Sequence, residues 1–389
     1  MKQTLQDVLA PFRQFFQMES SSGLVLLLAA IAALLLANSP FAGTYEALLH
    51  LLVGTATFAM PLEHWVNDGL MTIFFFAIGL EIKREFLYGE LRTKSAMILP
   101  VTAALFGMLV PALLYSLINA GTETAGGWGI PMATDIAFAL GILSLVGRDA
   151  PLGLVVFLTA LAIVDDLGAI VVIALFYSTD ISFLSLGLGL LALLAAFLLG
   201  RTRFRGRKSL PLYLMLGLLA WIAFLSSGIH PTIAGVLLGL SIPADANAAH
   251  SLLHRVESAL EPWSAYFIMP VFALANAGVA IGGSSFSITS PLCLGIAAGL
   301  ILGKPIGIFG STKLLTAAIR APLPGNAATR QLLGVGSLGG IGFTMSIFIA
   351  TLAFPDAETL AAAKLSILSA SILSGILGAL ILRLTRTAK

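Results

Sequence analysis

Long apolar stretches recur along the whole chain, separated by charged, proline-rich or glycine-rich breaks. About 20 apolar residues are enough for a helix to cross the hydrocarbon core of a bilayer. Reading the stretches in this way predicts helices over about residues 22–37, 61–87, 97–119, 128–146, 151–177, 182–200, 210–225, 229–242, 256–280, 291–314, 331–354 and 359–383. Hydrophobic residues make up 58% of the chain and charged residues 10%, which excludes a soluble globular protein. We therefore expect a single all-α, polytopic membrane domain over residues 1–389, with twelve transmembrane helices.

The distribution of basic residues gives the expected orientation. All but two of the 21 Lys and Arg residues fall in the termini and loops on one side of a twelve-helix chain; the exceptions are Lys304, inside a span, and Lys364. The positive-inside rule then predicts that both termini are cytoplasmic. The basic run at residues 201–208 fits a topology determinant better than an anionic-lipid contact. On the opposite side, residues 42–60 are too interrupted for a span, and we expect a hairpin or surface segment there, with a subunit contact as its candidate role.

The N-terminal segment resembles a signal peptide only superficially. Apolar residues recur at helical spacing within residues 1–16, which predicts an amphipathic helix lying on the membrane surface. The single cysteine, Cys293, rules out an internal disulfide and reads as a packing residue.

Two adjacent aspartates, Asp165 and Asp166, interrupt the otherwise uncharged stretch of residues 152–177. A carboxylate near the bilayer centre costs about 2.5–3.5 kcal/mol on insertion scales, and membrane helices do not need one. The pair therefore predicts a cation or proton site. Adjacent helical residues project about 100° apart, so one aspartate can face a basic residue while the other faces an aqueous funnel. Spacing alone does not assign the two roles.

Two spans, one in each half of the chain, carry signals of interruption. Pro131 precedes Thr134 and Asp135 in the first, and five glycines fall within residues 334–342 of the second. A patched proline kink and close packing through small residues are the alternative readings. Broken spans in both halves are typical of inverted-repeat transporters. We expect the repeats to be helices 3–5 and 10–12, about residues 97–177 and 291–383, with their breaks crossing at the midplane. Residues 22–87 and 182–280 would form the scaffold and interface helices.

Crossed half-helices bring like dipole ends together, and these ends need compensating charges. Asp135 is placed to offset the positive ends, and Lys304 the negative ones. Lys304 lies well inside its span, where a buried ammonium needs a counter-charge. Asp165 and Asp166 are both candidates for this partner, and snorkelling of Lys304 to the interface is the alternative.

Four motifs together resemble the NhaA-type sodium/proton antiporters of bacterial inner membranes. They are ATDIAFALG at 133–141, ALAIVDDLGAI at 160–170, GKP at 303–305 and GIGFTMSIF at 340–348. The resemblance runs from about residue 23 to residue 383. This family is itself a known example of inverted-repeat transporters, so the repeat pattern and the resemblance are not independent.

The resemblance implies exchange of cytoplasmic Na⁺ or Li⁺ for two external protons, which is electrogenic and serves sodium and pH homeostasis. Asp166 would be the main ligand of the transported cation, assisted by Asp165 and Thr134. Lys304 would pair with Asp165, and Asp135 would compensate charge at the breaks. No cofactor and no nucleic acid are implied; the expected partners are Na⁺, Li⁺, H⁺, membrane lipids and a second copy of the chain.

The resemblance also implies a pH response through a cytoplasmic cluster. Its acidic members correspond to Glu81, Glu85 and Glu257, whereas Ser258 and Glu261 stand where the best-known member carries histidines. That difference leaves the pH set-point open. His230 also occupies a position tied to pH response, and a structural hydrogen bond is its alternative role.

Three other functions fit parts of the pattern. A sodium-coupled solute symporter would need further hydrogen-bonding groups, for which Asn67, Asp68, Asn276 and Ser346 are available. An intramembrane aspartyl protease needs two carboxylates converging on one water, whereas adjacent residues of a helix diverge, leaving Asp135 as the only other partner. A passive channel would conduct sodium without moving protons. An antiporter, which is not an enzyme, accounts for the most residues.

Overall fold

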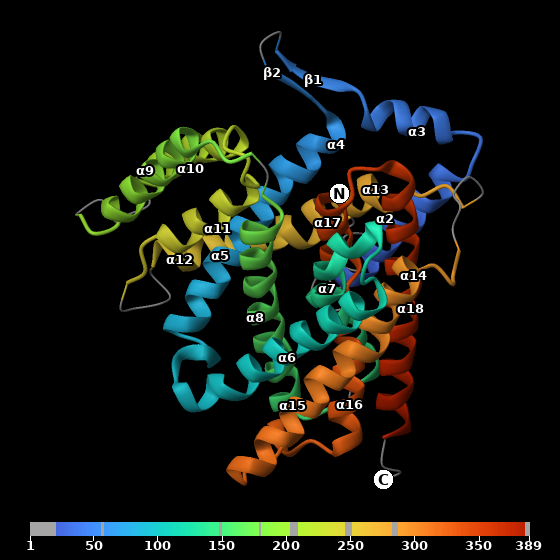
Figure 1. Cartoon of the computed structure of the whole chain (residues 1–389). Helices are drawn as coiled ribbons and strands as arrows, with labels where there is room; N and C mark the ends of the chain where they lie inside the picture. Colours follow the sequence, from blue (N-terminus) through green and yellow to red (C-terminus); the bar gives the residue numbers. More distant parts are fainter. Residues whose placement is uncertain are drawn as a thin grey trace, which may run out of the picture.

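The computed structural model describes residues 21–55, 58–147, 150–178, 180–202, 209–245, 251–281 and 287–385. The amphipathic helix expected over residues 1–16 and most of the basic run at 201–208 lie outside these ranges. The described chain is almost entirely helical, with one two-stranded sheet (Figure 1).

The helices fall over all of the predicted ranges. The α-helices are α2 (Ser21–Ala37), α3 (Ala42–Leu49), α4 (Leu62–His64), α5 (Met71–Leu87), α6 (Lys94–Ile118), α7 (Ile136–Val146), α8 (Leu152–Phe176), α9 (Phe183–Leu199), α10 (Leu210–Leu225), α11 (Thr232–Ser241), α12 (Leu252–Trp263), α13 (Met269–Asn276), α14 (Pro291–Ala297), α15 (Lys304–Ile319), α16 (Thr329–Leu338), α17 (Phe343–Ala353) and α18 (Ala357–Leu384). The 3₁₀-helices are η2 (Glu90–Arg92), η3 (Glu123–Met132) and η8 (Pro324–Asn326), and the π-helices are η1 (Trp65–Leu70), η6 (Ser264–Ile268) and η7 (Ala298–Gly303).

Length and composition mark this chain as a multi-pass membrane protein. Five uninterrupted helical stretches in the described residues are long and apolar enough to cross a membrane: Leu62–Leu87, Ala96–Ile118, Leu152–Phe176, Pro291–Ile319 and Ala357–Leu384. Three bent pairs add to them: α2 with α3 at 115°, η3 with α7 at 45°, and α16 with α17 at 43°. The last two bends fall where the sequence predicts interrupted spans. Helices α9, α10 and α11 are apolar but shorter.

Side-chain caps set several helix starts. Ser251 and Ser290 accept hydrogen bonds from the backbone N–H of His254 and Cys293, each three residues further on. Asp356 accepts from both the backbone and the hydroxyl of Thr359, and these hydrogen bonds lower the pKa of its carboxyl. Each of these residues pairs one of the backbone N–H groups left free at the start of α12, α14 or α18.

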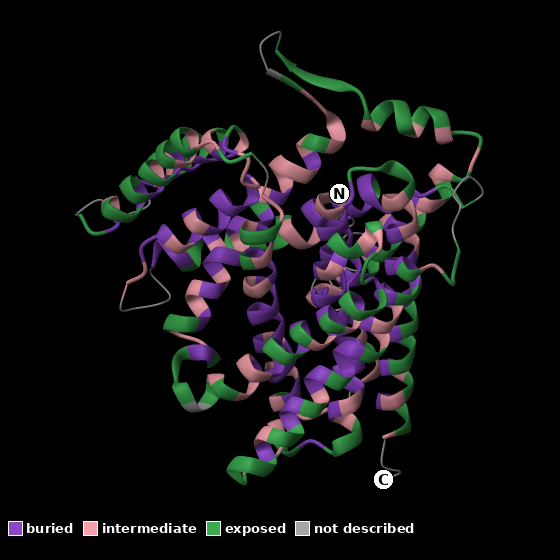
Figure 2. Ribbon diagram, viewed as in Figure 1, coloured by how far each residue is buried: buried purple, intermediate pink, exposed green. Residues whose placement is uncertain are grey.

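Glycines allow α5 and α11 to pack unusually closely. A Cβ on Gly79 would lie 2.5 Å from the Val236 carbonyl oxygen, and one on Gly239 would lie 2.6 Å from the Phe76 carbonyl oxygen. Small residues at helix contacts are the usual means of close association in membranes. Buried residues gather where these two helices meet α8 and the helices of the C-terminal third, while α9 and the hairpin are largely exposed (Figure 2).

The expected hairpin is present and follows α3. Strands β1 (Leu52–Thr55) and β2 (Phe58–Pro61) pair antiparallel, with Leu52 opposite Pro61. The Trp65 indole donates to the Val53 carbonyl oxygen at 2.8 Å and fastens the hairpin to η1. The hairpin extends away from the helical body (Figure 1).

Candidate functional site

The two helix breaks lie directly against each other. Between η3 and α7 the backbone is extended, with φ/ψ of −86°/150° at Ala133 and −86°/99° at Asp135. The Asp135 N–H donates to the carbonyl oxygen of Ile341, which lies between α16 and α17, at 2.6 Å. The Ser346 hydroxyl donates to the Ile130 carbonyl oxygen at 2.7 Å. Each break thus satisfies backbone groups that the other leaves free, as required where helices are interrupted in a membrane.

Asp135 caps both of the helices that begin at this junction. One carboxylate oxygen accepts from the Phe138 N–H of α7 at 3.1 Å. The other accepts from the Thr344 hydroxyl at 2.5 Å and from the Thr344 N–H at 3.3 Å, at the start of α17. A negative charge is thereby placed at two positive helix ends. The sequence alone did not single out Thr344; its signal is a hydroxyl residue two positions after Gly342, the last glycine of the run.

Asp165 and Lys304 form a fully buried ion pair. The Lys304 ammonium donates to the Asp165 Oδ2, and both side chains have 0% exposure. The Thr134 hydroxyl lies 2.7 Å from the same oxygen and 2.8 Å from the Gly339 carbonyl oxygen, so its single proton serves two acceptors. The π-helix η7 ends at Gly303, immediately before Lys304, and π-turns are frequent at functional sites. The second Asp165 oxygen, Oδ1, is buried without a hydrogen-bond partner.

Asp166 points in a different direction, as expected for the next residue of a helix. It is 3% exposed and lines a cavity of about 430 Å³ that does not include Asp165 or Lys304. Its Oδ1 is also buried without a hydrogen-bond partner. The remaining residues that line this cavity are Phe74, Ala77, Ile78, Glu81, Arg84, Thr134, Asp135, Ile136, Ala137, His254, Glu257, Ser258, Glu261, Ser264, Ala265, Met269 and Met345. The cavity therefore connects the intramembrane aspartate with the charged ends of α5 and α12.

An arginine organises the charged part of this cavity. Arg84 forms ion pairs with Glu257, at 2.6 Å, and with Glu85, at 2.5 Å. Glu81 lines the cavity, whereas Glu85 does not. The Oε2 of Glu85 instead accepts a hydrogen bond from the Glu90 N–H at 2.9 Å. The Glu257 Oε2 is buried without a hydrogen-bond partner. Three of the acidic residues singled out by the sequence therefore gather around one guanidinium, and two of them face the cavity.

His230 lies apart from that cluster, in the turn before α11. Its Nδ1 is 2.8 Å from the Thr232 hydroxyl, and its Nε2 is 3.4 Å from a carboxylate oxygen of Asp68. The imidazole also contacts the Phe348 ring of α17 edge to face, with 5.2 Å between centroids. The hydroxyl of Thr232 gives the imidazole a structural hydrogen bond, and the contacts with Asp68 and Phe348 place the histidine between η1 and α17.

The chemistry of the site is that of oxygen ligands for a hard cation or a proton. Buried carboxylate oxygens normally have partners, so two that lack them on adjacent residues call for an explanation. Hard cations prefer oxygen donors. Within the described ranges, no three His, Cys, Asp or Glu side chains converge on one metal position.

Comparisons with known proteins place the chain among membrane transporters. The sequence model of the Na⁺/H⁺ antiporter 1 family matches residues 13–382. The chain is 50% identical to Na⁺/H⁺ antiporter NhaA 2 of Clostridium beijerinckii, covering 97% of this chain and 95% of that protein. It is 47% identical to NhaA of Oleidesulfovibrio alaskensis (98% and 95% covered) and 47% identical to NhaA of Yersinia enterocolitica (97% of each).

A solved structure shares the fold at low sequence identity. The sodium proton antiporter MjNhaP1 from Methanocaldococcus jannaschii superimposes with a TM-score of 0.51, at 15% identity, covering 98% of this chain and 96% of that one. A carrier with buried carboxylates is thus the class that fold and site define. The chain belongs to the Na⁺/H⁺ antiporter 1 family, whose members are secondary transporters and not enzymes.

Proposed function

We propose that the protein exchanges cytoplasmic Na⁺ or Li⁺ for external protons across the bacterial inner membrane, with both termini in the cytoplasm. The observation that carries the proposal is Asp166, a buried aspartate that lines a cavity shared with charged helix ends and has one oxygen without a hydrogen-bond partner. The family relationship supports Na⁺ and H⁺ as the exchanged ions. The arrangement of the basic loops supports the orientation.

Exchange follows from competition for the same oxygens. Asp165, Asp166 and Lys304 are close enough to titrate as one coupled group. A bound cation requires ionised carboxylates, and protons remove that charge, so the two substrates exclude each other. Two protons for each cation, released by this group as a whole, make the exchange electrogenic.

Alternating access requires that the site move relative to a fixed frame. In our proposal the twelve helices divide into a core, residues 97–177 and 291–383, and a scaffold formed by residues 22–87 and 182–280. The joined breaks support a core that moves as one body, since Asp135 contacts both of its halves. A core loaded with a cation or with protons would cross past the scaffold, while an empty charged core would not.

Reconstituted protein tests the exchange directly. Proteoliposomes carrying an imposed pH gradient receive Na⁺, Li⁺ or K⁺ outside while lumenal pH is followed. Antiport predicts that Na⁺ or Li⁺ collapses the gradient. Sodium flux without proton movement would instead indicate a channel. Absence of proton movement with Na⁺ and Li⁺ at several pH values would remove the antiporter proposal and favour a solute symporter.

Lowering the pH is expected to weaken Na⁺ binding, because protons displace the cation from the carboxylates. The apparent Kd for Na⁺ should rise by up to about tenfold per pH unit for each competing proton, over the range where the group takes up protons. Isothermal titration of Na⁺ into detergent-solubilised protein at a series of pH values measures this slope. A Kd that stays constant with pH would contradict competition.

A pH response is part of the same proposal. Glu81, Glu85 and Glu257 surround Arg84 next to the cavity, so a change in their protonation alters the charge that a cation meets on its way to Asp166. His230 would act separately, through its contacts with Asp68 and the core helix α17.

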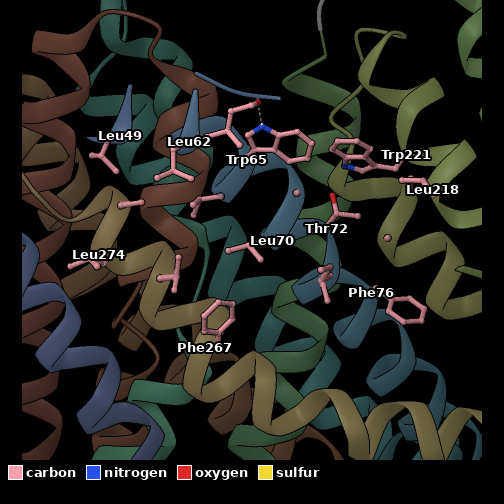
Figure 3. A pocket seen from close by; sticks show the side chains of 18 of the residues that line it. Leu49, Leu62, Trp65, Leu70, Thr72, Phe76, Leu218, Trp221, Phe267 and Leu274 are labelled. Atoms are coloured by element: carbon pink, nitrogen blue, oxygen red, sulfur yellow. Dashed lines mark hydrogen bonds between the residues drawn. The ribbon is translucent and has the colours of Figure 1, made fainter. Parts of the chain in front are cut away.

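We also propose that the protein forms a homodimer through the hairpin. Strand β1 is exposed along its whole length, and exposed strand edges readily pair with another chain. An apolar cavity of about 760 Å³ continues this surface between α5, α10 and α13, where Trp65 and Trp221 stack with 6.1 Å between ring centroids (Figure 3). A second copy would cover both the hairpin and this cavity.

Replacing residues 52–61 by a short Gly-Ser linker is expected to convert the dimer to a monomer. The Leu62 N–H donates to the Leu51 carbonyl oxygen, so the two ends are close enough to be joined without disturbing α5. Size-exclusion chromatography with light scattering, in mild detergent, gives the mass. The exchange assay serves as the folding control. A linker variant that remains dimeric would exclude the hairpin as the contact.

A further inference from the structure

One face of α12 is directed into the cavity that holds Asp166. His254, Glu257, Ser258 and Glu261 all line it, and they are spaced three and four residues apart, as on one side of a helix. The lining continues through Ser264 and Ala265 of η6 to Met269. Because α12 rises about 1.5 Å per residue, Glu261 lies about 6 Å beyond Glu257, toward the apolar part of the wall.

The charges in this cavity do not balance. Its carboxyl-bearing residues are Glu81, Asp135, Asp166, Glu257 and Glu261, against a single guanidinium, that of Arg84. Arg84 is already engaged by Glu257 and by Glu85. Among the ion pairs that the described residues make, none involves Glu261. A passage lined by one sign of charge and bounded by apolar walls concentrates counter-ions inside it.

Asp166, in the same lining, offers a place where such a counter-ion could bind. Asp166 is almost fully buried, faces the cavity and retains an oxygen without a hydrogen-bond partner. A cation drawn into the cavity by Glu261 therefore shares it with a carboxylate that is not fully coordinated.

We propose that Glu261 is a cation-capture residue, which raises the local Na⁺ concentration in the cavity and thereby lowers the KM for Na⁺ without coordinating the ion at the transport site. This inference rests on the proposed function. It assigns a role to a position where the sequence departs from the best-known member of the family, which carries a histidine there. The free carboxylate of Glu261 acts at a distance, so its effect depends on ionic strength.

The test is Glu261→Gln in everted membrane vesicles, in which the cytoplasmic face is outside. At low ionic strength the KM for Na⁺ should rise by about two- to fivefold with unchanged maximal rate. Impermeant choline chloride at about 1 M shortens the Debye length to about 3 Å and should bring wild type and variant to the same KM. Glu261→Asp should restore the wild-type KM. Glu358→Gln removes an exposed carboxylate that lines a different pocket, and should change nothing.

Three results would overturn the proposal. The KM could be unchanged at low ionic strength, the difference could persist in choline chloride, or Glu261→Gln could lower the maximal rate and shift the pH profile at every ionic strength. The last result would assign Glu261 to pH control or to folding. Failure of the proposed function would look different, because wild type itself would then show no Na⁺-dependent proton movement.

Discussion

Asp166→Asn is expected to abolish Na⁺- and Li⁺-driven proton movement while the protein still folds and inserts. Asparagine has nearly the same shape as aspartate, and it keeps a neutral oxygen in the cavity. It cannot be ionised to hold a cation, and it cannot carry the exchanged proton. Because Asp166 makes no ion pair with any residue that the structure describes, its loss leaves no unpaired partner among them. Proteoliposome flux should fall at least a hundredfold, to the level of empty vesicles, since both substrates use this group.

The matched control is Asp180→Asn, at an exposed aspartate with φ of 48°, a conformation that asparagine adopts as readily. It should exchange like wild type. The thermal midpoint of Asp166→Asn in detergent should be at or above that of wild type, because a buried charge has been removed. Normal Na⁺ transport by Asp166→Asn would rule out this residue as the cation ligand.

Lys304→Ala should strongly destabilise the protein. The ion pair with Asp165 is completely buried, and removing one partner from such a pair costs about 3–5 kcal/mol because the other charge is left unpaired. Asp165 would retain only the shared hydroxyl of Thr134. We expect a large fall in the thermal midpoint in detergent, together with weakened exchange or a changed number of protons per cation.

A double variant separates the loss of the pair from the loss of lysine packing. Asp165→Asn with Lys304→Gln removes both charges and should recover much of the stability lost in Lys304→Ala. Lys313→Ala, on the same helix but at an exposed lysine, should leave the thermal midpoint unchanged. If Lys304→Ala proved as stable and as active as wild type, with the same stoichiometry, the pair would have no role in transport or folding.

Hydropathy and helix-breaking residues predicted where the long apolar helices and both bends fall, because these depend on local composition, but not the short helix α3. Pro131 and the glycine run each mark a place where a continuous helix is costly, and the chain is bent at both. The π-helices η1, η6 and η7 could not be predicted, since a π-turn depends on the packing around it and not on a local residue pattern.

The sequence predicted which residue types would form the intramembrane site, but not which of them would be in contact. Two adjacent aspartates point in different directions on any helix. Which of them pairs with Lys304 and which lines the cavity depends on the position of α15 relative to α8. Thr344 as a partner of Asp135, and the turning of Glu85 away from the cavity, likewise depend on tertiary contacts between distant segments.

The sequence separations of these contacts have a consequence for how the protein is made. Asp165 precedes Lys304 by 139 residues, and Asp135 precedes Thr344 by 209. At about 5–20 residues per second, a ribosome synthesises the aspartate-bearing helices roughly 7–40 s before their partners. During that interval the nascent N-terminal half holds Asp135 and Asp165 in the membrane without the groups that later stabilise them. Its insertion therefore requires that they stay protonated, or close to the translocon or to water, until the C-terminal half arrives.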